Sequence, residues 1–234
     1  RAMMKGKLYC VGIGPGDPEL LTVKALKTIG ACPVLAVPKS GSGPLTAKDI
    51  LLKALDDCDL TLSDKKVLTL DFPMTRKDEV LAGAHEKAAK AVMADLDEGR
   101  DVALITLGCP TVYATSIYVH HLVQEAGYET AIVPGVPSFC AVAAKLQQPL
   151  CEKDEALLII PGNHEQRRQL LALPGSKVIM KPSGKLKPIQ DELKDLGLLE
   201  RTSMIERCGL SGEKIYEQAA DAEETGYFAV LLVK

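Results

Sequence analysis

The chain has 234 residues, which is long enough for one large α/β domain or two small ones. Apolar residues make up 47% and charged residues 25%, a balance that excludes an intrinsically disordered chain. The net charge of −3 and the pI near 5.9 argue against a basic nucleic-acid or anionic-membrane surface over the whole chain. Because there is no Trp and there are only three Phe, the core must be aliphatic.

Short aliphatic or β-branched runs alternate along the chain with longer amphipathic stretches. Strands separated by helices indicate parallel crossover units and therefore an α/β fold. The predicted strands are Leu8–Ile13, Val34–Val37, Val67–Leu70, Val102–Leu107, Thr130–Val133, Leu157–Ile160, Lys177–Met180, Thr202–Glu206 and Tyr227–Val233. The predicted helices are Pro18–Ile29, Thr46–Leu55, Lys77–Glu98, Thr115–Ala126, Ser138–Leu146, Glu165–Leu171 and Leu186–Leu196.

Local sequence signals predict the limits of the first helix and of the first domain. Asp17 is the expected N-cap, Pro18 fits the first helical position, and Gly30 is expected to stop the helix. A domain boundary is expected near Gly127, because one helix ends there and a new strand–turn–helix unit follows. This divides the chain into an N-terminal domain, residues 1–126, and a C-terminal domain, residues 127–234.

No apolar run reaches the roughly 18 to 20 residues of a membrane-spanning helix. The N-terminal residues lead directly into a strand-like run without a signal-peptide core, so we expect a cytoplasmic protein. The seven cysteines are odd in number and irregularly spaced, which fits neither a disulfide framework nor a zinc site. We therefore expect free thiols and no metal site.

A glycine-rich turn, Gly12-Ile13-Gly14-Pro15-Gly16-Asp17, connects the first strand to the first helix. It does not fit the dinucleotide fingerprint, because the sixth position holds Asp17 where glycine is required. Carboxylates at Asp17 and Glu19 would also repel a phosphate at this helix start. No G-x-x-x-x-G-K-[ST] sequence is present, which excludes a P-loop. A tight turn without a ligand remains the structural alternative.

Two further loops follow predicted strands in the same way. They are Thr106-Leu107-Gly108-Cys109-Pro110-Thr111-Val112-Tyr113-Ala114-Thr115 and Val133-Pro134-Gly135-Val136-Pro137-Ser138-Phe139. Ligands of open α/β sheets bind at the carboxyl ends of the strands, so the three loops suggest one composite site. They contain few charges, which predicts a ligand held by backbone groups and shape. Simple strand-to-helix connections are the alternative.

These three stretches resemble the signatures of the tetrapyrrole methylase family, S-adenosylmethionine-dependent enzymes of corrin and sirohaem synthesis. Gly108-Cys109-Pro110 with Tyr113 is similar to the family's G-D-P-x-x-Y motif, and Pro134–Phe139 is similar to P-G-[IV]-x-[SA]. Within the family, the segment Asp71–Arg76 most resembles the branch that methylates carbon 20 of precorrin-2 or cobalt-factor II. The loop Val37–Ser40 and the segment Glu206–Gly209 resemble that branch as well.

The resemblance implies two α/β domains of mixed sheets with the cofactor, S-adenosylmethionine, in a trough between them, and a homodimer. Matching the motifs position by position implies cofactor contacts from Pro15, Leu107, Gly108, Cys109, Val112, Pro137, Ser138, Met180 and Cys208. The chain departs from the family pattern at Cys109, which stands where the family has aspartate. A backbone carbonyl or another acid must then serve any role of that carboxylate.

The substrate implied by the resemblance is a tetrapyrrole with eight carboxylates, so cationic side chains are expected around its site. Lys39, Arg76 and Lys181 are the candidates, because each lies at or near the end of a predicted strand. Tyr113 is a further candidate substrate contact, and it could act as a general base only if its pKa were lowered. No catalytic residue is assigned, since alignment of donor and acceptor is expected to supply most of the rate.

Two alternatives stay open. One is another specificity on the same scaffold, such as methylation of uroporphyrinogen III or precorrin-4, diphthine synthesis or ribosomal-RNA methylation. The other is a ligand-binding module without turnover, which the departure at Cys109 allows. The sequence does not decide whether the substrate contains cobalt.

Overall fold

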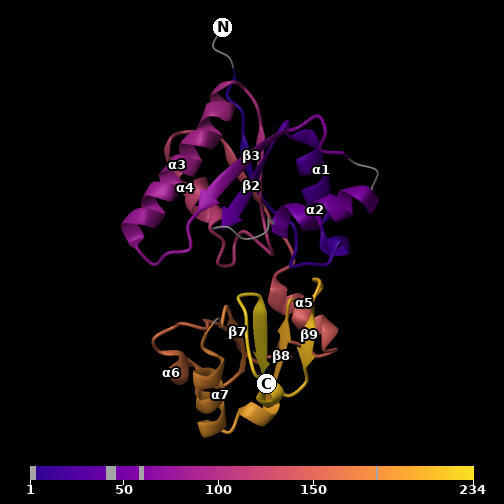
Figure 1. Ribbon diagram of the computed structural model, residues 1–234, viewed down its shortest axis with the longest axis vertical. Coiled ribbons are helices and arrows are strands. Elements are labelled where there is room, and N and C mark those ends of the chain that lie inside the picture. The colour runs from indigo at the N-terminus through magenta and orange to yellow at the C-terminus, as the bar shows by residue number, and fades with distance from the viewer. Residues whose placement is uncertain (1–3, 41–45, 58–60, 183) are drawn as a thin grey trace. The chain divides into compact units, whose positions relative to one another are not determined.

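The computed structural model describes residues 4–40, 46–57, 61–182 and 184–234. The chain forms two compact units, residues 1–137 and residues 138–234 (Figure 1). Each unit contains one five-stranded sheet with helices beside it. The predicted fold class, two α/β domains, is therefore confirmed.

The first unit is built on a sheet with the strand order β3-β2-β4-β1-β5. Every named pair of its strands is parallel, so their carboxyl ends meet at one edge. The strands are β1 (Leu8–Gly12), β2 (Val34–Ser40), β3 (Lys66–Phe72), β4 (Val102–Thr106) and β5 (Thr130–Val133). The helices are α1 (Val23–Ala31), α2 (Thr46–Asp57), α3 (Asp78–Asp97) and α4 (Ser116–Glu125).

The aliphatic residues of the first unit form its core, as the composition predicted. All five residues of the central strand β4 are buried, which is the continuous apolar pattern of a sheet covered on both faces. The strands and helices α3 and α4 share one cluster that includes Leu8, Leu104, Val92 and Val119, each with no exposed surface. This core fixes the positions of the strand ends that carry the loops.

The predicted helix Pro18–Ile29 is wrong in two details. The structure has a short 3₁₀ helix, η1 (Pro18–Leu20), and then α1, which begins after a second N-cap, Thr22. The Thr22 hydroxyl accepts a hydrogen bond from the Ala25 N–H at 3.0 Å. Gly30 does not stop the helix but lies within it, and α1 ends at Ala31, two residues before Pro33. Because the residue before a proline is disfavoured in the helical region, Pro33 explains the end of α1 better than Gly30 does.

The second unit has a mixed sheet with the strand order β6-β7-β10-β8-β9. β6 and β7 are parallel, and the other named pairs are antiparallel. The strands are β6 (Leu157–Pro161), β7 (Ser176–Met180), β8 (Thr202–Glu206), β9 (Lys214–Tyr216) and β10 (Ala229–Val233). The helices are α5 (Ser138–Lys145), α6 (Arg167–Leu171) and α7 (Leu186–Asp195), and two 3₁₀ helices are η2 (Leu199–Arg201) and η3 (Ala219–Asp221).

Strand β9 is the one named strand that the sequence pattern did not predict. It has only three residues, and Lys214 and Ile215 are both exposed, so no alternation of buried and exposed side chains marks it. β9 pairs with β8 as the last strand of the second sheet. The core of this unit is aliphatic too, with Leu231, Ile179 and Ile189 fully buried.

The two units divide between Pro137 and Ser138, whereas the sequence placed the boundary near Gly127. The difference arises from β5, which pairs in parallel with β1 from Leu8↔Thr130 to Val11↔Val133. The strand after Gly127 therefore completes the first sheet instead of starting the second unit.

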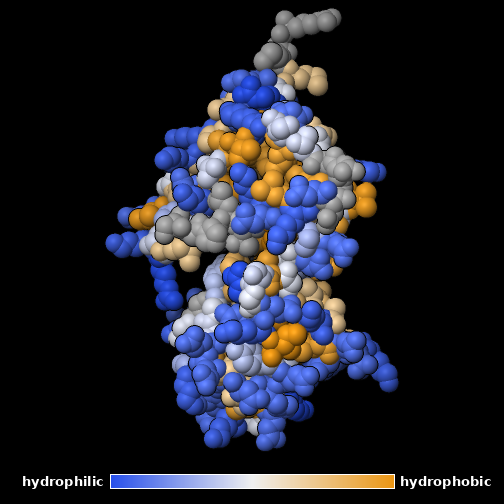
Figure 2. Space-filling model, turned by 45° about the vertical axis from the view of Figure 1, so that its right-hand side comes forward, coloured by the Kyte–Doolittle hydropathy of each residue, from blue (hydrophilic) through white to orange (hydrophobic). Residues whose placement is uncertain are grey.

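Hydrophilic side chains cover most of the face drawn in Figure 2, and apolar side chains gather in separate patches. No helix among the described residues is long and apolar enough to cross a membrane. Every cysteine in the described part of the chain is a free thiol, and Cys58 lies outside that part. Burial raises the pKa of Cys10 to about 12, so this thiol stays protonated at neutral pH.

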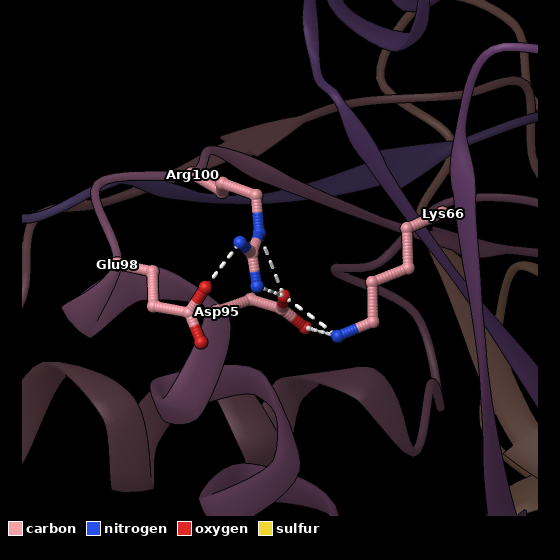
Figure 3. Close-up of polar contacts among 4 residues, drawn as sticks. All are labelled: Lys66, Asp95, Glu98 and Arg100. Atoms are coloured by element: carbon pink, nitrogen blue, oxygen red, sulfur yellow. Dashed lines mark hydrogen bonds and ion pairs between the residues drawn. The ribbon is translucent and has the colours of Figure 1, made fainter.

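A cluster of charged side chains lies at the amino end of the first sheet (Figure 3). The Asp95 side chain, only 1% exposed, accepts hydrogen bonds from Lys66 Nζ at 2.9 and 3.1 Å and from Arg100 Nε at 2.9 Å. Arg100 also pairs with Glu98. Burial alone would raise the pKa of Asp95, but the bonds from Lys66 and Arg100 outweigh it and lower that pKa.

Candidate cofactor and substrate site

Three loops meet at the carboxyl edge of the first sheet. They follow β1, β4 and β5, which are neighbours in the order β4-β1-β5. The first two loops are joined by an isolated antiparallel bridge, in which Gly108 N–H donates to the Gly14 carbonyl at 2.7 Å. The Gly14 N–H donates to the Gly108 carbonyl at 3.3 Å. The structure therefore brings the three predicted motifs together.

Close backbone packing explains two of the glycines in these loops. A Cβ atom on Gly12 would lie 2.6 Å from the Gly108 carbonyl oxygen, and one on Gly135 would lie 2.2 Å from the same oxygen. Since real Cβ contacts are never this short, no other residue fits at either position without a backbone shift. The loops can approach one another only because these side chains are absent.

Gly108 is different, because a Cβ atom there would meet other atoms only at ordinary van der Waals distance. Its φ is +67°, and the nearest atoms to that Cβ, Pro137 Cα and Val136 O, would be 3.9 Å away. We call this space beside Gly108, bordered by Val136 and Pro137, the glycine cradle. A ligand group can reach the backbone of Gly108 where any other residue would place a side chain. Its surroundings are uncharged, so it fits the uncharged and backbone-recognised parts of the expected cofactor.

The six predicted cofactor residues of the first unit all lie on these loops. Five are partly exposed and one, Cys109, is buried: Pro15, Leu107, Gly108, Cys109, Val112 and Pro137. The structure thus gathers them at one edge, where a ligand can reach them. Their contacts with a cofactor remain predictions.

Cys109 stands in the position of the family's aspartate and has an unusual set of hydrogen bonds. Its Sγ lies 3.0 Å from Thr111 Oγ1. Burial alone would raise the pKa of the thiol, but hydrogen bonds from the Thr111 hydroxyl and from the backbone N–H groups of Gly135 and Thr111 lower it. The Cys109 sulfur is thus placed where it can accept hydrogen bonds from the second and third loops, as a carboxylate in its place could.

Tyr113 lies on the second loop with a left-handed backbone, φ +49°, and its side chain is 46% exposed. Burial raises the pKa of its phenol above the ordinary value. The phenol is therefore protonated at neutral pH and is a poor candidate for a general base. Tyr113 remains a predicted substrate contact, and the base stays unassigned.

The remaining predicted cofactor residues belong to the second unit. Met180 is the last residue of β7, and Cys208 follows shortly after β8. Since β7 and β8 lie on either side of β10, both residues are at the same end of the second sheet. Ser138 is the first residue of α5.

Arg167 is a buried residue near this end of the second sheet that the sequence analysis did not single out. It is 7% exposed and forms a bidentate pair with Glu192, with N···O distances of 2.7 and 2.9 Å. Its third nitrogen donates to the Gly162 carbonyl. Gly162 in turn packs against the loop after β7, because a Cβ on it would lie 2.6 Å from Pro182 Cα.

Arg167 therefore fixes the loop after β6 against the residues that follow Met180. Gly162 N–H also donates to the Met180 carbonyl at 2.6 Å, which joins the two strand ends directly. One feature of the sequence indicates that Arg167 is buried. Arg167 stands one helical turn before the buried Leu171, on the apolar face of a predicted helix.

The three predicted substrate cations divide between the units. Lys39 is half-buried near the end of β2, and Arg76 is exposed in the loop after the adjacent strand β3. The Ser40 hydroxyl donates to Met74 Sδ at 3.1 Å, which ties the ends of these two strands together. Lys181 directly follows β7 in the second unit.

The histidines are not placed as metal ligands in the part of the chain that the structure describes. In these ranges, no group of three His, Cys, Asp or Glu side chains could hold a metal ion. His85 stacks on Tyr118 with ring centroids 4.7 Å apart, and His120 is buried on α4. Burial lowers the pKa of both His85 and His120.

Residues 7–222 match the tetrapyrrole (corrin/porphyrin) methylases. The chain belongs to this family, which confirms the resemblance of its three motifs. It is 31% identical to the cobalt-precorrin-2 C(20)-methyltransferase of Salmonella typhimurium, over 98% of this chain and 97% of that protein.

A longer relative and a solved structure complete the comparison. The chain is 31% identical to the cobalamin biosynthesis protein CobIJ of Mycobacterium tuberculosis but spans only 46% of its length. The fold matches uroporphyrin-III C-methyl transferase from Thermus thermophilus, solved in complex with S-adenyl homocysteine, with a TM-score of 0.71 at 23% identity. That match covers 97% of each chain.

Proposed function

We propose that this protein is an S-adenosylmethionine-dependent methyltransferase that methylates carbon 20 of precorrin-2 or cobalt-factor II in cobalamin biosynthesis. The observation that carries the proposal is the glycine cradle at Gly108, where three family motifs meet at the carboxyl edge of the first sheet. The similarity to the Salmonella typhimurium C(20)-methyltransferase over nearly the whole chain supports the choice of substrate. The segment Asp71–Arg76, which resembles the same branch, supports it further.

We propose that the first unit binds the methyl donor mainly through its backbone. Leu107, Gly108 and Cys109 present peptide groups at the cradle, and Val112 provides an apolar contact beside them. Pro15 and Pro137 border the same edge with rigid backbone. A neutral, preorganised site of this kind suits a cationic sulfonium, because no competing cation of the chain lies among these residues.

The donor, when bound, supplies a methyl group already activated by the positive charge on its sulfur. The chain then has to align that group with the nucleophilic carbon of the substrate and exclude water. The methylated carbon must also lose a proton. Tyr113 does not accept it as a phenolate, because its pKa is raised, so the acceptor of this proton stays unassigned.

The substrate is anionic, and we propose that Lys39, Arg76 and Lys181 contact its carboxylates. We propose that the protein acts on this small molecule as a homodimer, as the family resemblance implies, and in the cytoplasm. Light scattering coupled to gel filtration measures the mass in solution. A mass of about twice 25.1 kDa supports the dimer and a mass near 25.1 kDa rejects it.

A radiolabel transfer assay tests the proposed reaction. Purified protein is incubated with methyl-labelled S-adenosylmethionine and, in separate reactions, precorrin-2, cobalt-factor II, precorrin-4 and uroporphyrinogen III. Transfer to precorrin-2 or cobalt-factor II, with the new methyl at carbon 20 by NMR, supports the proposal. Transfer only to uroporphyrinogen III or precorrin-4 would replace it with another specificity. Donor binding without transfer to any of them would favour a ligand-binding module.

A further inference from the structure

Two cationic residues flank the start of β10 at one end of the second sheet. β7 ends at Met180 and β8 ends at Glu206, and both residues pair with the first residues of β10. The next residues along the chain are Lys181 and Arg207. Figure 1 shows β7 and β8 on either side of the yellow strand β10. Because neighbouring strands lie about 4.8 Å apart, the backbones of the two cations are roughly 10 Å apart.

Both cations have a backbone conformation that long side chains rarely adopt. The φ angle is +54° at Lys181 and +54° at Arg207, in the left-handed region that favours glycine. Such conformations persist only where the surrounding structure enforces them, and they cluster at sites that clamp ligands. At Arg207 the enforcing contacts are an N–H bond to the Phe228 carbonyl at 3.1 Å and a bond from Nε to the Ser211 carbonyl at 2.7 Å.

Two aromatic rings immediately before β10 support the cations. Tyr227 and Phe228 pack edge to face with centroids 5.2 Å apart. Lys181 Nζ lies 5.3 Å from the centre of the Tyr227 ring, and Arg207 Cζ lies 5.8 Å from the centre of the Phe228 ring. These distances are within the range of cation–π attraction. A ring orients a cation but carries no net charge, so neither ring contact cancels the positive charge of its cation.

The nearby acidic groups do not neutralise Arg207. In the part of the chain that the structure describes, no carboxylate forms an ion pair with Arg207, and its two terminal nitrogens make no hydrogen bond. Glu206 faces the backbone of Gly226, where an added Cβ would lie 2.6 Å from its Oε1. Glu213 accepts bonds from Gly209 N–H and Lys145 Nζ. The planar guanidinium therefore offers a fork that matches a carboxylate in bidentate geometry.

We propose that Lys181 and Arg207 form a carboxylate clamp, in which each cation binds one of two carboxylates roughly 10 Å apart on a polyanionic substrate. Tyr227 and Phe228 are its positioning residues, because they act by orienting the cations. This inference rests on the proposed function and names the part of the second unit that recognises the acidic side chains of the tetrapyrrole. Arg207 and the two rings were not among the residues predicted from the sequence.

Steady-state kinetics of three variants tests the clamp. Arg207→Gln removes the charge, Arg207→Lys keeps the charge but loses the fork, and Phe228→Leu removes the ring. We expect the KM for the tetrapyrrole to rise at least tenfold, about fivefold and about threefold, respectively, while kcat and the Kd for S-adenosylhomocysteine change less than twofold. Arg168→Gln is the matched control, because Arg168 is exposed and pairs with Asp195 on the surface.

The outcomes separate this inference from the proposed function. An unchanged KM in Arg207→Gln, with the fold intact by circular dichroism, overturns the clamp. A weaker Kd for S-adenosylhomocysteine with an unchanged KM also overturns it, because the pair would then serve the donor. If the wild type transfers no methyl group, the proposed function fails. The clamp is then tested by fluorescence titration with uroporphyrin, a tetrapyrrole with eight carboxylates, and equal affinity of wild type and Arg207→Gln overturns it.

Discussion

At the amino end of the first sheet, charged side chains hold the structure together, whereas at the carboxyl end the peptide groups of glycines do so. At the amino end, Asp95 is buried with two cations as partners. At the other end Gly12, Gly108 and Gly135 pack backbone against backbone. The comparison indicates a division of roles: the charged cluster stabilises the unit, and the loops after β1, β4 and β5 leave peptide groups accessible to a ligand.

The largest expected effect is at the backbone contact between the second and third loops. Gly135→Ala places a Cβ 2.2 Å from the Gly108 carbonyl oxygen, and only a shift of the backbone can relieve this overlap. We expect the free energy of unfolding to fall by about 3 kcal/mol or more in urea denaturation. Gly30→Ala is the control, because a Cβ there meets nothing within 4 Å, and it should raise stability by about 0.5–1 kcal/mol. Equal stability of the two variants would contradict the packing argument.

Removing the buried charge tests the other end of the sheet. Asp95→Asn leaves Lys66 and Arg100 without their shared carboxylate, and we expect a loss of about 2–3 kcal/mol in the free energy of unfolding. The loss is smaller than for a fully buried pair because both cations are partly exposed. Affinity for S-adenosylhomocysteine should not change, and a large change would contradict the division of roles.

The same variant has a defined dependence on pH. The pKa of Asp95 is lowered in the folded protein, so its contribution to stability is complete above the unfolded value of about 3.9 and is lost as pH falls through the folded value. The difference in free energy of unfolding between wild type and Asp95→Asn should therefore be constant above about pH 5 and shrink below about pH 4. A difference that grows toward acid pH would show that the pKa is raised instead.

Arg167 extends the comparison to the second unit, where a buried ion pair stands at the candidate-site end. Arg167→Gln breaks the bidentate pair with Glu192 and the bond to the Gly162 carbonyl, and we expect a loss of about 2 kcal/mol. Arg168→Gln, at the exposed neighbouring pair, should cost less than about 0.5 kcal/mol. Thermal unfolding of both proteins distinguishes them, and similar midpoints would mean that burial of Arg167 contributes nothing.

The smallest expected effect on stability is at Cys109, in the second of the three loops. Cys109→Ala removes the acceptor of the Gly135 and Thr111 N–H groups and should lower the free energy of unfolding by about 1 kcal/mol. Cys109→Asp restores an acceptor, as in the family motif, and should recover at least half of that loss. Chemical denaturation measures both values. If Cys109→Asp is less stable than Cys109→Ala, the sulfur is not acting as a hydrogen-bond acceptor.

Local patterns were sufficient to predict nine of the ten strands that the structure names, because each is an aliphatic or β-branched run between turn residues. β9 lacks such a run and depends on pairing with β8, so only tertiary structure defines it. The break at Thr22 was missed because the stronger start signal at Asp17 and Pro18 comes first. Pairing of β5 with β1 was likewise not readable from a single segment.

The candidate site was predictable where it consists of contiguous motifs and not where it depends on folding. The three loops could be placed at one edge, since parallel strands share their carboxyl ends. The difference between Gly108, with room for a side chain, and Gly135, with none, requires the positions of all three loops. The roles of Arg167 and Arg207 depend on partners at Glu192 and Phe228, which are distant in the chain.

The central claim is that the glycine cradle at Gly108 binds the methyl donor, and titration calorimetry of S-adenosylhomocysteine tests it directly. Gly108→Ala places one methyl group in the cradle without a close contact, so the cost in stability should be about 1 kcal/mol, from the positive φ alone. We predict that its Kd rises at least tenfold, or about 1.4 kcal/mol, relative to wild type. A Kd within twofold of the wild-type value, in a folded variant, would contradict the account.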